Sequence, residues 1–99
     1  MVHVVARSAD LPEESSLRCT IGAREIAVFR RGGQLYAIDA ACPHRQGPLD
    51  EGEIEDDFVV VCPWHGRRFD LRDGSSPSGH GRVNCYKVRI EDENVVIEL

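Results

Sequence analysis

The sequence predicts a single all-β domain spanning residues 1–99, with a loop-rich segment inserted between its strands. Short runs of β-branched and aromatic residues recur along the chain, broken by Gly, Asp and Pro, whereas helical periodicity is nearly absent. The chain has 99 residues, 41% hydrophobic and 29% charged, which suits one globular core and leaves no room for a second.

Seven strands are expected from these runs. They are residues 2–6, 25–30, 35–39, 58–61, 68–70, 84–90 and 95–98. Gly32 and Gly33 separate the second and third strands and predict a hairpin turn, because glycine tolerates positive φ. Alternating apolar residues over 86–99, interrupted at 91–94, predict a closing hairpin. Residues 12–16 are the one hint of a helical turn.

The segment from about 40 to 82 differs in character from the rest of the chain. It is rich in Gly, Pro, Cys and His and has little apolar alternation. Loops of this length carry a large backbone entropy and bury little apolar area, so something must order them. A bound metal centre is the natural candidate, which makes residues 40–82 a predicted metal-binding subdomain.

Four candidate ligands lie in this segment: Cys42 and His44, then Cys62 and His65. Each pair combines a thiolate with an imidazole at close spacing. Tetrahedral zinc also accepts two Cys and two His, although zinc fingers usually keep the two cysteines together and the two histidines together. A disulfide between Cys42 and Cys62 is a further alternative, disfavoured in a reducing compartment.

With the prolines and glycines around these ligands, residues 42–47 and 62–66 resemble the Rieske family, whose pattern is Cys-x-His followed by Cys-x-x-His. Residues 69–74 and the closing hairpin are also similar to small Rieske ferredoxins. The resemblance implies the Rieske fold: stacked antiparallel sheets, three in number, with the cluster-binding subdomain between strands. Residues 74–81, which contain Pro77, are shorter than the usual proline-containing loop that shields the cluster, so less complete shielding is expected here.

The resemblance also implies one [2Fe–2S] cluster per chain. Cys42 and Cys62 would hold one iron, and His44 and His65 the other. Two neutral imidazoles leave the centre less negative than four thiolates would, which raises its reduction potential. Gly47 and Gly66 would permit close backbone approach around the cluster.

Within the Rieske range, the sequence predicts a low potential. High-potential members resemble this motif but add two cysteines that form a disulfide, at positions occupied here by Gly47 and Trp64. They also carry a Ser and a Tyr whose hydroxyls donate hydrogen bonds to sulfur, where this chain has Arg67 and Phe69. Without these donors, less electron density is drawn from the cluster.

The implied function is that of an electron carrier rather than an enzyme. It would pass single electrons from a flavin-dependent ferredoxin reductase to a terminal oxygenase, as in aromatic-ring dioxygenase systems. A Rieske oxygenase would need two more histidines and a carboxylate for mononuclear iron, and only His3 and His80 remain. A small redox subunit of a nitrite-reductase-like or other multi-component enzyme, and a cluster-based redox sensor, remain alternatives.

The net charge and the hydropathy of the chain limit which kinds of partner the protein could bind and where in the cell it is expected. A formal net charge of −5 argues against nucleic acid, and no apolar run approaches the roughly 18 residues that span a membrane. The N-terminus shows no basic leader before an apolar segment, so a cytoplasmic location is expected. Acidic residues concentrate at 50–57 and 91–93, either as a negative face for a basic partner or as solvated turns.

Three further residues are expected to be structural. Cys19 and Cys85 lie in strand-like surroundings without a second ligand nearby, which predicts small buried side chains. Trp64 is expected to be an interior aromatic without a redox role.

Overall fold

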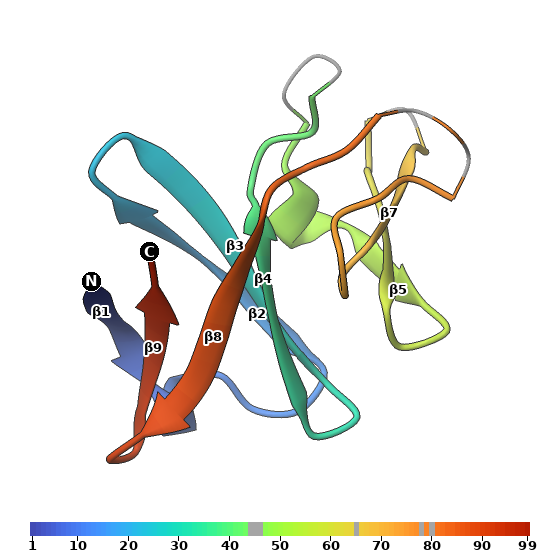
Figure 1. Cartoon of the computed structure of the whole chain (residues 1–99). Helices are drawn as coiled ribbons and strands as arrows, with labels where there is room; N and C mark the ends of the chain where they lie inside the picture. The colour runs from blue at the N-terminus through green and yellow to red at the C-terminus, as the bar shows by residue number, and fades with distance from the viewer. Residues whose placement is uncertain (44–46, 65, 78, 80) are drawn as a thin grey trace.

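The computed structural model describes residues 1–43, 47–64, 66–77, 79 and 81–99 (Figure 1). Nine strands and two short 3₁₀ helices account for its regular structure within these ranges. They are β1 (Val2–Arg7), η1 (Ser8–Asp10), β2 (Ser15–Ile21), β3 (Arg24–Arg31), β4 (Gln34–Asp39), η2 (Leu49–Glu51), β5 (Glu53–Glu55), β6 (Val59–Val61), β7 (Arg68–Asp70), β8 (Cys85–Glu91) and β9 (Asn94–Glu98). None of the described helices is long and apolar enough to span a membrane.

The strands form two antiparallel sheets. A six-stranded sheet has the order β1-β9-β8-β4-β3-β2, and a three-stranded sheet has the order β5-β6-β7. Strands β4 and β8 pair at Ala37–Tyr86 and Ile38–Cys85, so the larger sheet is joined at a short seam between two three-stranded halves. The all-β class with antiparallel sheets is confirmed, and two of the three predicted sheets are continuous through this seam.

Two strands were not predicted. A turn expected at 12–16 is present, closed by the Ser15 amide donating to the Pro12 carbonyl at 3.2 Å, but it is not helical, since Glu14 has a φ of 64°. Residues from Ser15 onward form β2, which pairs with β3 along its whole length. Side chains of β2 alternate between partly buried and exposed, with Leu17 and Cys19 turned inward. The polar residues of this strand mask its alternation in the sequence. Strand β5 has a single inward residue, Ile54, between two glutamates, which is too short a pattern to detect.

Both predicted hairpins are present. Gly32 and Gly33 adopt φ values of 59° and 76° in the turn between β3 and β4. The turn between β8 and β9 reaches the same left-handed region with Asp92 and Glu93, at φ values of 51° and 65°. Paired positive φ values match the right-handed twist of the flanking strands, which explains two-residue turns at both places.

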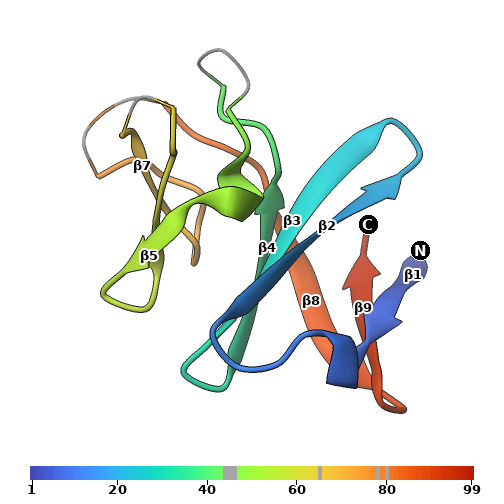
Figure 2. The same ribbon diagram turned by 180° about the vertical axis from the view of Figure 1, so that it is seen from behind.

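The core has two parts, one on each face of β3. Ile26 and Val28 pack toward the two halves of the larger sheet, whereas Ala27 and Phe29 pack toward the three-stranded sheet. The part that contains Ala27 and Phe29 also contains both candidate cysteines, with Leu49, Val60, Phe69, Leu71 and Val83. Figure 2 shows the three-stranded sheet lying to one side of β3 and β4. The two candidate cysteines are therefore built on core positions, and their backbone is held by packing.

The turn after β7 is organised by a carboxylate. The half-exposed Arg72 donates hydrogen bonds to Asp70 from its backbone amide (2.8 Å) and from its guanidinium (3.0 and 2.8 Å). These bonds, made to a largely buried side chain, hold the pKa of Asp70 below its ordinary value of 3.8, against the effect of burial. The guanidinium also lies 3.8 Å from the centre of the ring of Phe58, the residue that precedes β6.

We expect Asp70→Asn to lower the free energy of unfolding by about 1 kcal/mol at pH 7, a modest value because Arg72 is half exposed. A carboxylate whose folded pKa is depressed stabilises the fold above its unfolded pKa and loses that contribution as the pH falls through the folded value. The difference between wild type and variant should therefore shrink below about pH 4. Urea denaturation at pH 7 and near pH 3 measures it.

The control for this substitution is Glu55→Gln, which removes the carboxylate of an exposed ion pair with Arg68. An equal and pH-independent loss in both variants would contradict the assigned role of Asp70.

Candidate metal centre

Two loops of similar construction carry the candidate cysteines. In the first, the Cys42 amide donates to the Gly47 carbonyl at 2.9 Å. In the second, the Cys62 amide donates to the Arg67 carbonyl at 2.8 Å, and the Gly66 amide donates to the Cys62 carbonyl at 2.9 Å. Each cysteine thus begins a short loop that a backbone hydrogen bond closes.

The two cysteines are buried at 1% exposure and lie in the same part of the core. No disulfide joins Cys42 to Cys62, both of which are described. Buried thiolates are costly without a compensating cation, so this position fits a metal better than it fits two ionised sulfurs alone. The structure thereby removes one of the alternatives that the sequence left open.

His44 and His65 lie outside the described residues, and their role as ligands stays a prediction. Their positions in the chain fall between the residues that close the two loops, 42 with 47 and 62 with 67. Within the described part of the chain, no group of three or more His, Cys, Asp or Glu side chains could hold a metal ion. A donor set of two cysteines therefore needs completion from outside that part.

Gly47 brings the two loops into direct contact. An ideal Cβ at this position would lie 2.6 Å from the Cys62 Sγ atom and 3.3 Å from Cγ of Trp64. Real Cβ atoms do not approach sulfur so closely, so the residue at 47 must be glycine if the loops are to keep this separation. Gly47 thus permits a close approach between the two loops themselves, while Gly66 serves its loop by a positive φ of 69°; their approach to a cluster stays a prediction.

Three side chains differ from their predicted surroundings. Trp64 is 57% exposed and was wrongly expected to be interior. Cys85 is exposed and Cys19 partly buried, so neither is the buried hydrophobe that was expected. Desolvation raises the pKa of both thiols. Alternation in β8 and the partial covering of β2, an edge strand, explain these positions, which local sequence does not encode.

A third loop follows β7 and approaches the same end of the molecule. It is closed by an isolated bridge between Ser75 and Arg82, and the Ser76 amide donates to the Gly81 carbonyl at 3.2 Å. Asp73 supports its start by accepting hydrogen bonds from the amide and hydroxyl of Ser75. Pro77 is exposed on this loop.

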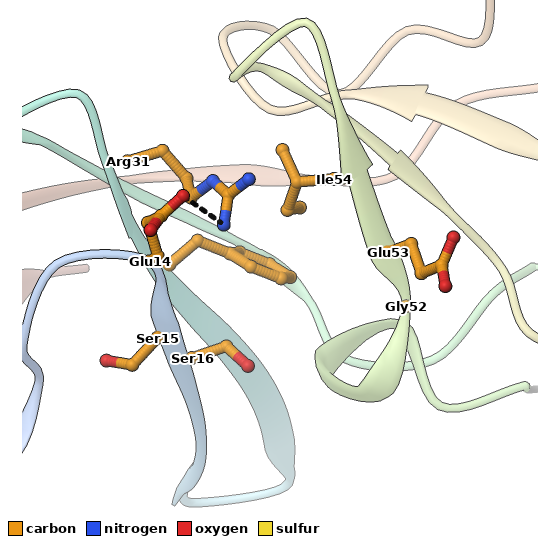
Figure 3. A pocket seen from close by; sticks show the side chains of 8 residues that line it. Glu14, Ser15, Ser16, Arg31, Gly52, Glu53 and Ile54 are labelled. Carbon is orange, nitrogen blue, oxygen red and sulfur yellow. Dashed lines mark ion pairs between the residues drawn. The ribbon is translucent and has the colours of Figure 1, made fainter.

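A separate hollow of about 350 Å³ lies where the three-stranded sheet meets β2 and β3 (Figure 3). Arg31 and Glu14 form an ion pair at 3.9 Å on one side of it, and Ile54 lies on the other side. Its lining contains neither cysteine nor histidine. The hollow therefore offers no ligand for the predicted metal centre.

Comparison with known proteins agrees with this arrangement. The sequence profile described as Rieske [2Fe-2S] domain matches residues 1–88. The chain is 36% identical over 93 residues to the 3-phenylpropionate/cinnamic acid dioxygenase ferredoxin subunit of Escherichia coli K12, covering 92% of this chain and 87% of that protein.

Two solved structures extend the comparison. The ferredoxin of carbazole 1,9a-dioxygenase from Nocardioides aromaticivorans IC177 superposes with a TM-score of 0.87 at 26% identity, covering 98% of this chain and 96% of the other. A complex of reduced oxygenase and oxidized ferredoxin in carbazole 1,9a-dioxygenase contains a chain with a TM-score of 0.84 at 28% identity, covering 97% and 91%. The predicted arrangement of stacked antiparallel sheets is confirmed by these superpositions.

We expect Gly47→Ala to force the two loops apart, because its methyl group would overlap the Cys62 sulfur. Overpacking of this kind typically costs 1–3 kcal/mol, so the free energy of unfolding should fall by about 2 kcal/mol. The emission of Trp64, the single tryptophan, should shift as its contact with position 47 changes. Urea denaturation and steady-state fluorescence measure both effects.

Gly66→Ala is the matched control, because its Cβ would meet no atom within 4 Å and only the positive φ is strained. It should cost about 1 kcal/mol and leave the Trp64 emission unchanged. Identical behaviour of the two variants would show that the loops are not in the close contact described.

Proposed function

Because this chain belongs to the Rieske [2Fe–2S] domain family, we propose that it is the ferredoxin of an oxygenase system, a one-electron carrier and not itself an enzyme. It receives electrons from a flavin-dependent ferredoxin reductase and delivers them to a terminal oxygenase in the cytoplasm, for the breakdown of aromatic compounds. The observation that carries this proposal is the 36% identity to a dioxygenase ferredoxin subunit over nearly the whole of both chains.

Family membership implies one [2Fe–2S] cluster, which supplies reversible one-electron storage when bound. We assign Cys42 and Cys62 to one iron and His44 and His65 to the other, within a cluster-binding subdomain of residues 40–82 in the single domain 1–99. Burial of both cysteines at the bases of two touching loops supports this assignment. The spacing of His44 from Cys42 and of His65 from Cys62 in the sequence supports the assignment of the two histidines to the other iron.

The surroundings of the two cysteines favour a low potential. Phe69 is fully buried in the same core cluster as Cys42 and Cys62, and a phenyl ring has no hydrogen-bond donor. Gly47 and Trp64 are neighbours across the two loops, so the positions where the resemblance places a disulfide are adjacent but lack its sulfurs. A low potential suits electron delivery from a reductase to an oxygenase.

Other assignments are separable by experiment. Zinc would fill two thiolates and two imidazoles equally well and would give a colourless protein. A subunit of a nitrite-reductase-like complex often lacks some cluster ligands, whereas this chain has all four residues. A redox sensor would bind the cluster but show no turnover with a reductase and an oxygenase.

Replacement of any proposed ligand should abolish cluster assembly. Cys42→Ser, Cys62→Ser, His44→Ala and His65→Ala each remove one of two protein ligands from an iron, so the visible absorption and the reduced-state EPR signal should disappear. Iron analysis and EPR of anaerobically purified protein measure this. Cys19→Ala and Cys85→Ala are the matched controls and should retain the cluster. Wild-type iron content in a ligand variant would refute that residue's assignment.

The reduction potential should lie near the low end of the Rieske range, which runs from about −150 to about +300 mV. Phe69→Tyr combined with Arg67→Ser should raise it by tens of millivolts, because added hydroxyl donors to sulfur favour the reduced state. Direct protein-film voltammetry of both proteins measures the values. A wild-type potential above about +100 mV would place the chain in the other class.

A further inference from the structure

Negative charge is missing from the three loop segments around the proposed cluster. Residues 40–49, 62–69 and 74–83 contain four of the 12 Lys and Arg residues and none of the 17 Asp and Glu residues, although the chain has a net charge of −5. Four carboxylates adjoin these segments: Asp39 accepts hydrogen bonds from Asn84 and Tyr86, Asp73 accepts them from Ser75, and the other two form ion pairs. Asp50 pairs with Arg18 at 2.8 Å, and Asp70 pairs with Arg72 at 2.8 Å.

Two described arginines of these segments keep their charge available. Arg67 is partly exposed and Arg82 exposed, and neither forms an ion pair with a carboxylate among the residues described. Arg82 donates instead to the Asp73 carbonyl at 3.3 Å. Arg68 differs, because Glu55 neutralises it at 2.7 Å. The loop end of the molecule therefore presents two arginines without a direct ion pair among the described residues, Arg67 and, near the Asp73 carboxylate, Arg82.

An exposed aromatic residue lies on the same loops. Trp64 is 57% exposed, yet its Cβ and Cγ atoms lie close to position 47. This contact holds the base of the side chain in place. Exposed large aromatics and arginines are the residue types that dominate binding energy in protein interfaces. Pro43 and Pro77 are also exposed on neighbouring loops, so the surface combines apolar groups with the cations.

Much of the acidic charge lies elsewhere. The turns at 56–57 and 92–93 point away from the chain segments 40–43 and 62–64 in both views (Figures 1 and 2). Strand β8 begins at Cys85, beside the loop end, and runs seven residues to Glu91, which places the second turn about 23 Å farther along. Of the acidic segments expected to face a basic partner, 50–57 begins beside the first cysteine-bearing loop, and only its turn at 56–57 and the turn at 92–93 are remote from the cysteines.

We propose that this end of the molecule docks against an acidic surface of its redox partner, with Trp64 as the apolar anchor and Arg67 and Arg82 as the pairing cations. The proposal rests on the electron-carrier function and adds the chemistry of the partner: a protein site rimmed by Asp and Glu around an apolar patch. The remote acidic turns orient the molecule by being repelled from the same surface.

Quenching of Trp64 emission by iodide and by caesium tests the local charge in the intact holoprotein. Iodide should quench more strongly than caesium at equal low ionic strength, although the net charge of −5 would favour caesium. In Arg67→Glu/Arg82→Glu the iodide quenching constant should fall by about twofold or more. Arg7→Glu, a charge reversal at the far end of β1, should change it little. Equal or stronger quenching by caesium in the wild type would overturn the proposal.

A partner-sized test uses succinylated cytochrome c, whose acylated lysines give it an acidic surface, as the electron acceptor from reduced holoprotein. The loop-end double variant should lose roughly tenfold in second-order rate at low salt, and Trp64→Ala should lose rate at all salt concentrations. The control variant Arg7→Glu, at the far end of β1, should change the second-order rate little. Equal slowing by Arg7→Glu and by the double variant would show that net charge alone matters and would overturn the proposal.

These outcomes are distinct from failure of the proposed function. Absence of a [2Fe–2S] spectrum would remove the electron-carrier assignment, whereas the quenching ratio reports the charge around Trp64 whether or not iron is present. A normal cluster spectrum with caesium-selective quenching would leave the carrier function and remove the acidic partner.

Discussion

The contact between Gly47 and the Cys62 sulfur is the constraint on which the rest of this site depends. Two loops from different parts of the chain meet with no room for a side chain between them. Such an approach brings two thiols into one core, where burial excludes water and where a metal centre can offset the cost of the buried sulfurs. The loops then need rigid support, because a small displacement would reopen the gap.

That support comes from the sheets beneath the loops. The first loop follows β4, which is the inner edge of one half of the larger sheet, and the second follows β6, the centre of the smaller sheet. Phe29 from β3 and Phe69 from β7 are both fully buried in the core that these strands share with the cysteines. Packing of these fully buried aromatic rings fixes the two sheets relative to each other. The loops that follow β4 and β6 are thereby held in contact.

Charged residues are also distributed differently between the loops and the sheets. Segments committed to the cysteine-bearing loops contain no carboxylate, and pairs of acids occupy the strand turns at 56–57 and 92–93. A carboxylate next to a redox centre would disfavour an added electron, so its absence there serves electron uptake as well as recognition. An acidic protein can in this way present a cationic end to another protein.

The sequence by itself determined the fold class, the two glycine- or acid-containing hairpin turns and the four candidate ligands, because alternation, turn chemistry and ligand spacing are local patterns. It also indicated that position 47 needs glycine. Strands β2 and β5 escaped prediction because their pairing partners, and not their own composition, make them strands. Only the tertiary structure decided that Trp64 and Cys85 are exposed, and that the turns at 56–57 and 92–93 lie far from the cysteines. Those properties depend on which segments pack over a residue, and burial of that kind is set by contacts between parts of the chain distant in sequence.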